Sequence, residues 1–184
     1  MGTRSKLHSL LAPPKFIFDI GQSGQEIVIE RKVLKTFAEH QQLRAGATEA
    51  GGQLFGTVAG TRINVSLATG PRAADVRTRY SFKPDRRAEQ AEIDHSHEKG
   101  LLYFGDWHTH PEPVPTPSFQ DLKSIREAFK KSTHHLNGFL LVIVGTDKLP
   151  SGLYVAIHND QEAVPLLSRS SAAGNKLSEE MGHS

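Results

Sequence analysis

The sequence predicts a single α/β domain, and three observations support this fold class. The chain has 184 residues, which is the usual size of one domain. Hydrophobic residues make up 37% and charged residues 23%, enough apolar material for a core and too little charge for a disordered chain. Strand-like stretches alternate along the chain with stretches of helical periodicity. We expect the domain to span residues 15–167, between an N-terminal segment, 1–14, and a flexible C-terminal tail, 168–184.

The first half of the chain predicts strands around one helix. Four stretches have strand character: residues 16–20, 26–29, 51–58 and 62–67. Residues 30–43 place apolar side chains at helical spacing, with charged side chains on the other face, and predict an amphipathic helix. Ala-Gly-Thr at 59–61 separates the last two strands, so we expect them to pair as a hairpin. Residues 70–84 are rich in arginine and show no periodicity, so we expect a loop.

The second half predicts two further helices and three further strands. The strand-like stretches are residues 101–107, 138–144 and 153–157. The middle one is apolar at nearly every position, which indicates a central strand. Residues 85–99 are polar and follow Pro84, a helix-start signal. Proline occupies every second position of 111–117, so we expect a stiff extended spacer. Ser118 is then a natural N-cap for a helix that continues to about Lys130.

Charge and cysteine content exclude several classes of protein. Twenty-two basic against twenty acidic residues give a net charge of +2, too balanced to indicate a nucleic-acid partner or an anionic membrane. The apolar stretches are far shorter than the ~20 residues that a membrane helix needs. The absence of cysteine excludes disulfides, a thiol nucleophile and thiolate zinc sites. We therefore expect a cytoplasmic protein in which any transition metal is held by imidazole and carboxylate groups.

His108 and His110 are separated by one residue at the end of a predicted strand. Their side chains leave the same face of that strand and can chelate one ion. Zinc takes histidine nitrogen and carboxylate oxygen, and a catalytic zinc needs three protein ligands and one open position. Asp121 is the best candidate for the third ligand, because it lies in the first turn of the helix after the spacer. The alternative is that Ser118 and Asp121 form only a capping box, which would not require the histidines.

The remaining histidines carry no such pattern. His95 and His97 also form a His-x-His pair, but they lie on a predicted helix. Side chains two residues apart on a helix point in different directions, so we expect both to be solvated. His134 and His135 follow the end of a predicted helix, where histidine is electrostatically favourable.

Five further residues have open interpretations. Trp107 is expected in the core or at the rim of the site, and Glu112 is a candidate substrate contact. Three arginines of the expected loop are candidates for lining a cleft or contacting an acidic partner, but a solvated loop is the favoured interpretation; they are Arg72, Arg77 and Arg79.

Two stretches together resemble the JAMM signature of the JAB/MPN/Mov34 zinc metalloproteases. One has His-x-His-Pro followed, after the spacer, by Ser-x-x-Asp, and it covers residues 108–121. The other reads Glu-Ala-Gly-Gly-Gln-Leu-Phe-Gly at 49–56, similar to the family's Glu-x-Gly-Gly-x-Leu-x-Gly. The resemblance covers about residues 16–157. It implies a single MPN (JAB) domain, with a curved, mostly antiparallel sheet flanked by helices and a cytidine-deaminase-like architecture.

The resemblance also implies a role for each motif residue. His108, His110 and Asp121 would hold Zn²⁺ and leave the fourth position to water. Glu49 would accept the proton of the water and return it to the leaving amine. Ser118 would donate its hydroxyl to the developing oxyanion. The implied reaction is amide or isopeptide hydrolysis without a covalent enzyme intermediate.

The chain looks most like stand-alone prokaryotic JAB proteases. Such proteins are often encoded beside activating- and conjugating-enzyme homologues, including those of antiphage defence, and these enzymes are the implied partners. The implied substrate is a ubiquitin-like modifier, or its conjugate with a target, cleaved after the C-terminal residue. An extended tail would bind by β-augmentation. The alternatives are a non-catalytic MPN scaffold in a larger complex and a small-molecule zinc hydrolase; deamination is disfavoured because the usual Cys-x-x-Cys ligand pair is absent.

Overall fold

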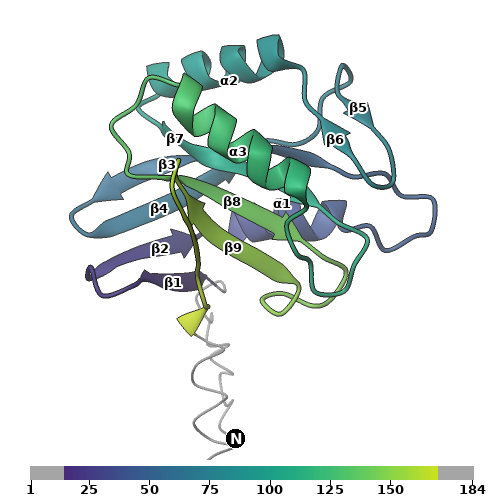
Figure 1. Cartoon of the computed structure of the whole chain (residues 1–184), viewed down its shortest axis with the longest axis horizontal. Helices are drawn as coiled ribbons and strands as arrows, with labels where there is room; N and C mark the ends of the chain where they lie inside the picture. The colour runs from purple at the N-terminus through teal and green to yellow at the C-terminus, as the bar shows by residue number, and fades with distance from the viewer. Residues whose placement is uncertain (1–14, 170–184) are drawn as a thin grey trace, which may run out of the picture.

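The structure, a computed structural model, describes residues 15–169. Its main feature is an eight-stranded curled sheet with the strand order β1-β2-β4-β3-β7-β8-β9-β10 (Figure 1). The strands are β1 (Phe16–Ile20), β2 (Gln25–Ile29), β3 (Gly51–Ala59), β4 (Arg62–Ala68), β7 (Leu102–Thr109), β8 (Phe139–Val144), β9 (Leu153–His158) and β10 (Ala163–Pro165). Only the β2–β4 and β7–β8 pairs of this sheet are parallel. The predicted α/β class, with a curved and mostly antiparallel sheet flanked by helices, is confirmed.

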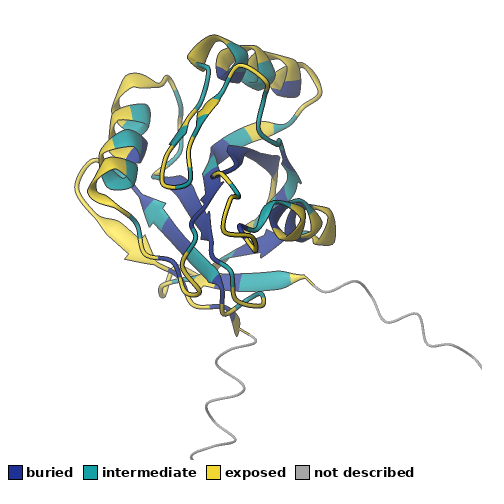
Figure 2. Cartoon of the chain, turned by 90° about the vertical axis from the view of Figure 1, so that its right-hand side faces the viewer, coloured by how far each residue is buried: buried dark blue, intermediate teal, exposed yellow. Residues whose placement is uncertain are grey.

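Helices cover both faces of the sheet. They are α1 (Arg31–His40), α2 (Arg86–Glu98) and α3 (Phe119–Lys131). Figure 2 shows α1 on one side of the buried strands and α2 and α3 on the other. The expected central strand, β8, lies between β7 and β9 and is buried at all six positions. Alternate side chains of β8 pack with α1 on one face and with α3 on the other, which explains its continuous apolar sequence.

A bulge at Gly105 determines which face of β7 each later side chain occupies. The pairing with β3 shifts register at this point, and Gly105 has φ +143°. A Cβ atom there would lie 1.9 Å from the carbonyl oxygen of Leu140, so only glycine fits. Beyond the bulge, Trp107 points toward α1, where its ring lies 5.0 Å from that of Phe37. His108 therefore points to the opposite face, toward α3.

The structure differs from the sequence predictions in several segments. Helix α1 ends at His40, three residues before the expected end. The expected loop at 70–84 contains a small hairpin of β5 (Val76–Arg77) and β6 (Phe82–Lys83), which forms a sheet of its own. The proline spacer bends at residues 111–114 instead of running straight. Backbone N–H groups of the β8–β9 loop hold the bend, since Thr146 and Asp147 donate to carbonyl oxygens of the spacer.

The described chain continues past the expected domain boundary at residue 167. Ser168 is buried and pairs with Phe18 of β1, and Arg169 forms ion pairs with Asp19 and Glu26. The rest of the predicted tail and the segment 1–14 lie outside the described residues. Among the residues 15–169, no helix has the length and apolar character to cross a membrane.

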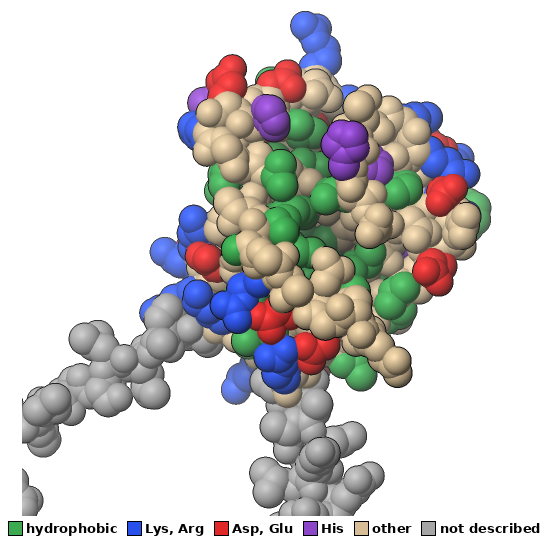
Figure 3. Space-filling model, turned by 90° about the vertical axis from the view of Figure 1, so that its left-hand side faces the viewer, with side chains coloured by type: hydrophobic (Ala, Val, Ile, Leu, Met, Phe, Trp, Pro, Cys, Tyr) green, Lys and Arg blue, Asp and Glu red, His purple; other side chains and the backbone are tan. Residues whose placement is uncertain are grey.

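A hydrophobic hollow lies at the end of the sheet where β3 finishes (Figure 3). Its volume is about 410 Å³, and side chains from both ends of the curled sheet line it, including Ile20, Ile63 and Ile157. Val58, near the end of β3, lines the hollow, whereas Glu49 lies just before the start of the same strand. The hollow and the candidate site therefore lie at opposite ends of the same strand.

Candidate active site

Glu49 lies two residues before the start of β3, and hydrogen bonds to both of its backbone groups hold it there. Its N–H donates to the carbonyl oxygen of Thr78 at 2.7 Å, and its carbonyl oxygen accepts from Nε of Arg77. The residue is only 4% exposed. Burial raises the pKa of the Glu49 carboxyl to about 7, with the neighbouring carboxylates adding to the effect and His110 opposing it. Such a group can accept and release a proton near neutral pH.

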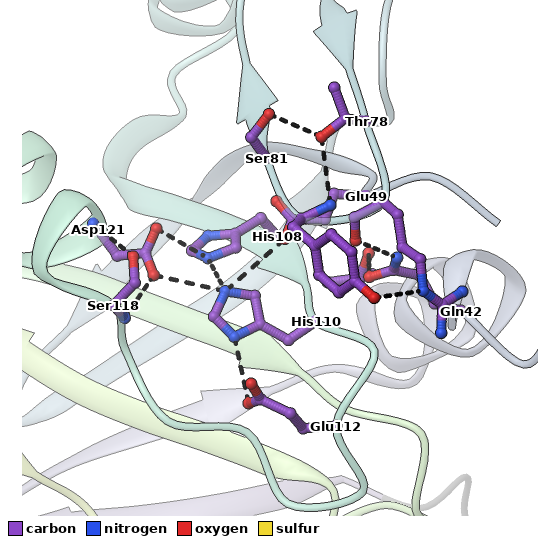
Figure 4. A network of polar contacts seen from close by, with 12 residues as sticks. Gln42, Glu49, Thr78, Ser81, His108, His110, Glu112, Ser118 and Asp121 are labelled. Atoms are coloured by element: carbon purple, nitrogen blue, oxygen red, sulfur yellow. Dashed lines mark hydrogen bonds and ion pairs between the residues drawn. The ribbon is translucent and has the colours of Figure 1, made fainter. Parts of the chain in front are cut away.

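His108 and His110 come together at the end of β7 as the strand period requires. Their Nε2 atoms are 3.2 Å apart, and both residues are 8% exposed. Oε1 of Glu49 lies 4.0 Å from Nε2 of His110. The Thr109 side chain between them points to the opposite face and is fully buried. Figure 4 shows both imidazole rings directed toward Asp121.

Asp121 is brought to the histidines by the N-terminus of α3. Its Oδ1 lies 3.3 Å from Nε2 of His108, and its Oδ2 lies 3.4 Å from Nε2 of His110. The capping box is also present: Asp121 Oδ2 accepts from the Ser118 N–H at 2.7 Å, and Ser118 Oγ accepts from the Asp121 N–H at 3.2 Å. The two interpretations of Ser118 and Asp121 are therefore compatible, because one carboxylate can take part in both arrangements.

The charges in this cluster are mutually stabilising. Burial alone would raise the pKa of Asp121, but hydrogen bonds from both imidazoles hold it well below its ordinary value. Burial likewise opposes protonation of His110, yet the Asp121 carboxylate beside it raises the pKa of His110 above its ordinary value. The site is thus arranged to keep a positive charge next to the carboxylate.

The three side chains fit a divalent metal ion. Their nearest ligand atoms all lie within 4.8 Å of one another. Two atoms that bind one zinc ion at tetrahedral angles, each about 2.0–2.1 Å from it, are about 3.3 Å apart. The 3.2 Å separation of the two Nε2 atoms agrees with that value, and the Asp121 carboxylate faces both imidazoles, with Oδ1 3.3 Å from His108 and Oδ2 3.4 Å from His110. Two imidazole nitrogens that face each other cannot both point a proton along the same line, whereas a shared cation satisfies both.

The cluster forms part of the wall of a cleft of about 750 Å³. The β5–β6 hairpin lines one side with Phe82 and Lys83, and α3 lines the other with Ser124 and Ile125. Glu49, His108 and Asp121 all border the same space. The cleft is large enough to receive several residues of an extended chain, with the candidate metal ligands at its wall.

Several predicted residues lie away from the cluster. Trp107 is 1% exposed and donates from Nε1 to the carbonyl oxygen of Thr69, so it is a core residue. His95 and His97 are exposed on α2, as predicted. The ring of His134 lies 4.4 Å from that of Phe129 at a tilt of 48°, and its Nε2 is 2.9 Å from the Phe129 carbonyl oxygen, near the end of α3.

The preference for a solvated arginine loop is wrong. Arg72 donates from Nε to Glu92 at 2.9 Å, and its side chain is 11% exposed. Arg77 binds the backbone of Glu49, and Arg79 donates to the carbonyl oxygen of Ala45. Arg77 and Arg79 thus attach the hairpin to the rest of the domain, and Arg72 attaches the segment before the hairpin to α2.

Two further polar residues lie beside the site: Glu112, which the sequence analysis proposed as a substrate contact, and Gln42, which it missed. Glu112 Oε2 lies 3.5 Å from Nδ1 of His110, so it faces a candidate ligand from behind rather than the cleft. Gln42 binds Thr109, the residue between the histidines. The proximity of Glu112 in sequence was a signal for the first contact. The second joins residues 67 positions apart, and no local pattern announces it.

Comparisons with known proteins agree with this geometry. Residues 30–158 match the family described as prokaryotic homologs of the JAB domain. A protein of Pseudomonas aeruginosa named CD-NTase/cGAS isopeptidase is 36% identical over 122 residues, covering 65% of this chain and 77% of the relative. A protein of the same name from Vibrio cholerae is 32% identical over 124 residues, covering 65% and 76%. The probable metalloprotease y4qB of Sinorhizobium fredii is 37% identical over 105 residues, covering 55% and 61%.

A solved structure supports the fold alone. The solution structure of protein DSY2949 from Desulfitobacterium hafniense superposes with a TM-score of 0.54 at 17% identity, covering 74% of this chain and 87% of that one. The family match spans most of the described domain and includes Glu49, the two histidines and Asp121. The chain therefore belongs to the family of prokaryotic homologs of the JAB domain, and it is a JAMM-type protease.

Proposed function

We propose that this protein is a zinc-dependent isopeptidase. Its substrate is a ubiquitin-like modifier in precursor form or a modifier–target conjugate. The hydrolysed bond is the one that joins the last residue of the modifier or conjugated protein to the next group. The observation that carries the proposal is the convergence of Glu49, His108, His110 and Asp121 in one cluster, from which Glu49, His108 and Asp121 line the same cleft. The relatives named CD-NTase/cGAS isopeptidase support conjugate cleavage, and they make a CD-NTase-like protein the first modifier to test.

The metal would be held by Nε2 of His108, Nε2 of His110 and the Asp121 carboxylate. A zinc ion so held lowers the pKa of water toward ~7 and acts as a Lewis acid on the scissile carbonyl. The capping box orients Asp121 before any ion arrives, because Ser118 N–H already binds its carboxylate. The chain thus provides two neutral ligands and one anionic ligand on rigid elements.

Two side chains act directly on the substrate in this proposal. Glu49 accepts a proton from the attacking water at a carboxylate oxygen and then delivers it to the nitrogen of the leaving amine. The Ser118 Oγ accepts from the Asp121 N–H, so its own proton remains available to donate to the carbonyl oxygen of the scissile bond. The burial of Glu49 limits competing contact with bulk water.

The cleft favours an extended tail as substrate. Strands β5 and β6 form a separate two-stranded sheet whose residues border the cleft, so a tail can align beside them by main-chain hydrogen bonding. We expect the protein to act in the cytoplasm alongside activating- and conjugating-enzyme homologues that make the conjugate.

The proposal is tested by incubating the protein with fusions in which a CD-NTase-like or ubiquitin-like modifier is joined through its C-terminus to a lysine side chain. We expect cleavage after the last modifier residue, loss of cleavage on zinc chelation and recovery with added zinc. The Glu49→Gln variant should keep its bound metal and lose about 10²–10⁴-fold in kcat. Full activity of metal-free protein would overturn the zinc mechanism. Tight binding of the fusions without cleavage would indicate a scaffold instead.

A further inference from the structure

The side chain of Gln42 is buried beside the site and makes polar contacts with three separate segments. It is 3% exposed, although glutamine is ordinarily a surface residue. Its Nε2 donates to the carbonyl oxygens of Ala47 at 3.1 Å and Arg79 at 3.0 Å. Its Oε1 accepts from Oγ1 of Thr109 at 3.1 Å. Burying an amide costs free energy unless its groups are paired, and here both N–H groups and the oxygen have partners.

Thr109 connects Gln42 to Ala50, the residue that follows Glu49. Its Oγ1 accepts from the Ala50 N–H at 3.0 Å, and its own N–H donates to the Ala50 carbonyl oxygen at 2.8 Å. Thr109 is also the residue between His108 and His110. One hydroxyl group therefore connects the two candidate metal ligands to the residue next to the proposed proton acceptor.

The β5–β6 hairpin provides a second connection between Gln42 and Glu49. Arg79 lies in the β5–β6 turn, so the bond from Gln42 fixes the tip of the hairpin. The same hairpin binds both backbone groups of Glu49, through the Thr78 carbonyl oxygen and the Arg77 guanidinium. Figure 4 shows Gln42, Thr78 and Glu49 on one side of the histidines and Asp121 on the other.

We propose that Gln42 is a positioning residue, which fixes Glu49 relative to His108 and His110 through Thr109 on one side and through the β5–β6 hairpin on the other. The inference rests on the proposed function, since it assigns the effect to the proton acceptor of that reaction. A displacement of about 1 Å in a reacting group can cost on the order of 10²-fold in rate. Loss of the Gln42 amide releases the segment on both sides of Glu49 at once.

The first test compares Gln42→Met with Gln41→Met. Methionine keeps the length of the side chain and removes its hydrogen bonds. Gln41 is the matched control, because its Nε2 also binds two backbone carbonyl oxygens, those of Gly145 and Asp147, but does not contact the Glu49 segment. We expect Gln42→Met to lower kcat about 10- to 100-fold with KM and zinc content unchanged. Gln41→Met should keep the wild-type kcat. A Gln42→Met protein that melts earlier but keeps kcat would overturn the proposal.

The second test asks whether Gln42 acts through Thr109. Thr109→Val removes the hydroxyl at nearly constant volume, and Thr109→Ser retains it. We expect Thr109→Val to lower kcat about 10-fold and Thr109→Ser to restore it. In a double-mutant cycle, Gln42→Met combined with Thr109→Val should lower kcat no more than Gln42→Met alone. Multiplicative losses would show that the two residues act independently and would contradict this route.

The third measurement does not depend on catalysis. Amide hydrogen exchange at Glu49 and Ala50 reports the two N–H groups that the hairpin and Thr109 hold. We expect Gln42→Met to accelerate exchange at both amides by at least 10-fold and to leave zinc affinity unchanged, with Gln41→Met as the reference. If the wild type cleaves no conjugate, the proposed function fails and the exchange rates still decide the positioning role. If conjugates are cleaved but exchange is unchanged, the positioning role alone is overturned.

Discussion

The two His-x-His pairs of this protein have the same spacing and entirely different environments. At the end of β7, His108 and His110 are buried and their Nε2 atoms lie 3.2 Å apart. On α2, His95 and His97 are exposed, and Nδ1 of His95 lies 3.8 Å from Glu98 of its own helix. In the strand the two rings leave one face, whereas in the helix they are turned about 200° apart.

The difference also depends on what lies opposite each pair. Helix α3 places the Asp121 carboxylate opposite His108 and His110. No described element packs over the exposed histidine pair on α2. A His-x-His pattern is therefore informative only when a strand is predicted to end there and a carboxylate can be placed across from it. Both conditions were readable from the sequence for the first pair and neither held for the second.

The largest expected effect comes from substituting a histidine of the buried pair, with the exposed pair as the control. His110→Ala removes a proposed metal ligand, so we expect loss of bound zinc and a fall in hydrolysis of at least ~10³-fold. Removing both His95 and His97 as alanine variants should leave zinc content and activity unchanged and alter stability by less than about 0.5 kcal/mol. Metal content by elemental analysis, with turnover of a conjugate, checks both. Equal zinc loss in the two proteins would contradict the comparison.

The second effect concerns the bulge at Gly105, which directs the His108 and His110 side chains toward α3. Gly105→Ala should lower the free energy of unfolding by roughly 2–4 kcal/mol, because the new Cβ would collide with the Leu140 carbonyl oxygen. Gly100→Ala is the matched control, since Gly100 has φ +75° but open space around its Cβ position. There we expect about 1 kcal/mol from backbone strain alone. Urea denaturation measures both; similar losses would show that the close contact at Gly105 is unimportant.

The third effect separates a cap that serves the site from one that does not. Ser118→Ala should cost about 1 kcal/mol in stability and about 10²-fold in kcat, since it removes both the N-cap of α3 and the proposed oxyanion donor. Asp85 caps α2 by accepting from the Ala88 N–H at 2.9 Å, and it is not one of the residues that line the cleft with the candidate metal ligands. Asp85→Ala should cost similar stability and no kcat. Thermal melts and steady-state kinetics on both proteins make the comparison, and an equal kcat loss would refute the role of Ser118.

The smallest effect concerns Glu112. Its carboxylate lies 3.5 Å from Nδ1 of His110 and is half exposed. A carboxylate behind a ligand imidazole fixes its tautomer and strengthens it as a ligand, and removing one typically costs about 10–100-fold in metal affinity. Because Glu112 is half exposed, we expect Glu112→Gln to weaken zinc binding by about 3- to 10-fold. Competition with a chromophoric chelator measures the affinity; an unchanged value would assign Glu112 no part in metal binding.

Much of the fold and of the candidate site was predictable, because both depend on local patterns. Strand β8 could be placed at the centre of the sheet from its continuous apolar sequence, and Asp121 could be placed at a helix start from Ser118 and the spacer. The spacing of His108 and His110 implied a shared face as soon as a strand was predicted there.

What could not be predicted depends on contacts between distant segments. Strands β5 and β6 have two residues each, too few to show a period. The contacts that hold them come from guanidinium and amide groups that bind backbone carbonyls, and any segment of the chain presents such acceptors. Gln42 reaches Arg79 and Thr109 across 37 and 67 positions, so neither contact has a sequence signature.

The capping box at α3 has a consequence for how the protein can evolve. Asp121 is held by Ser118 through hydrogen bonds that need no metal, so the helix start keeps its shape when the ion is removed. The domain is held by two hydrophobic clusters, one on each face of β8, and the candidate ligands belong to neither of them. A lineage that replaced the two histidines would thus lose its chemistry without losing the domain. The architecture allows catalysis to be discarded while a folded recognition surface persists.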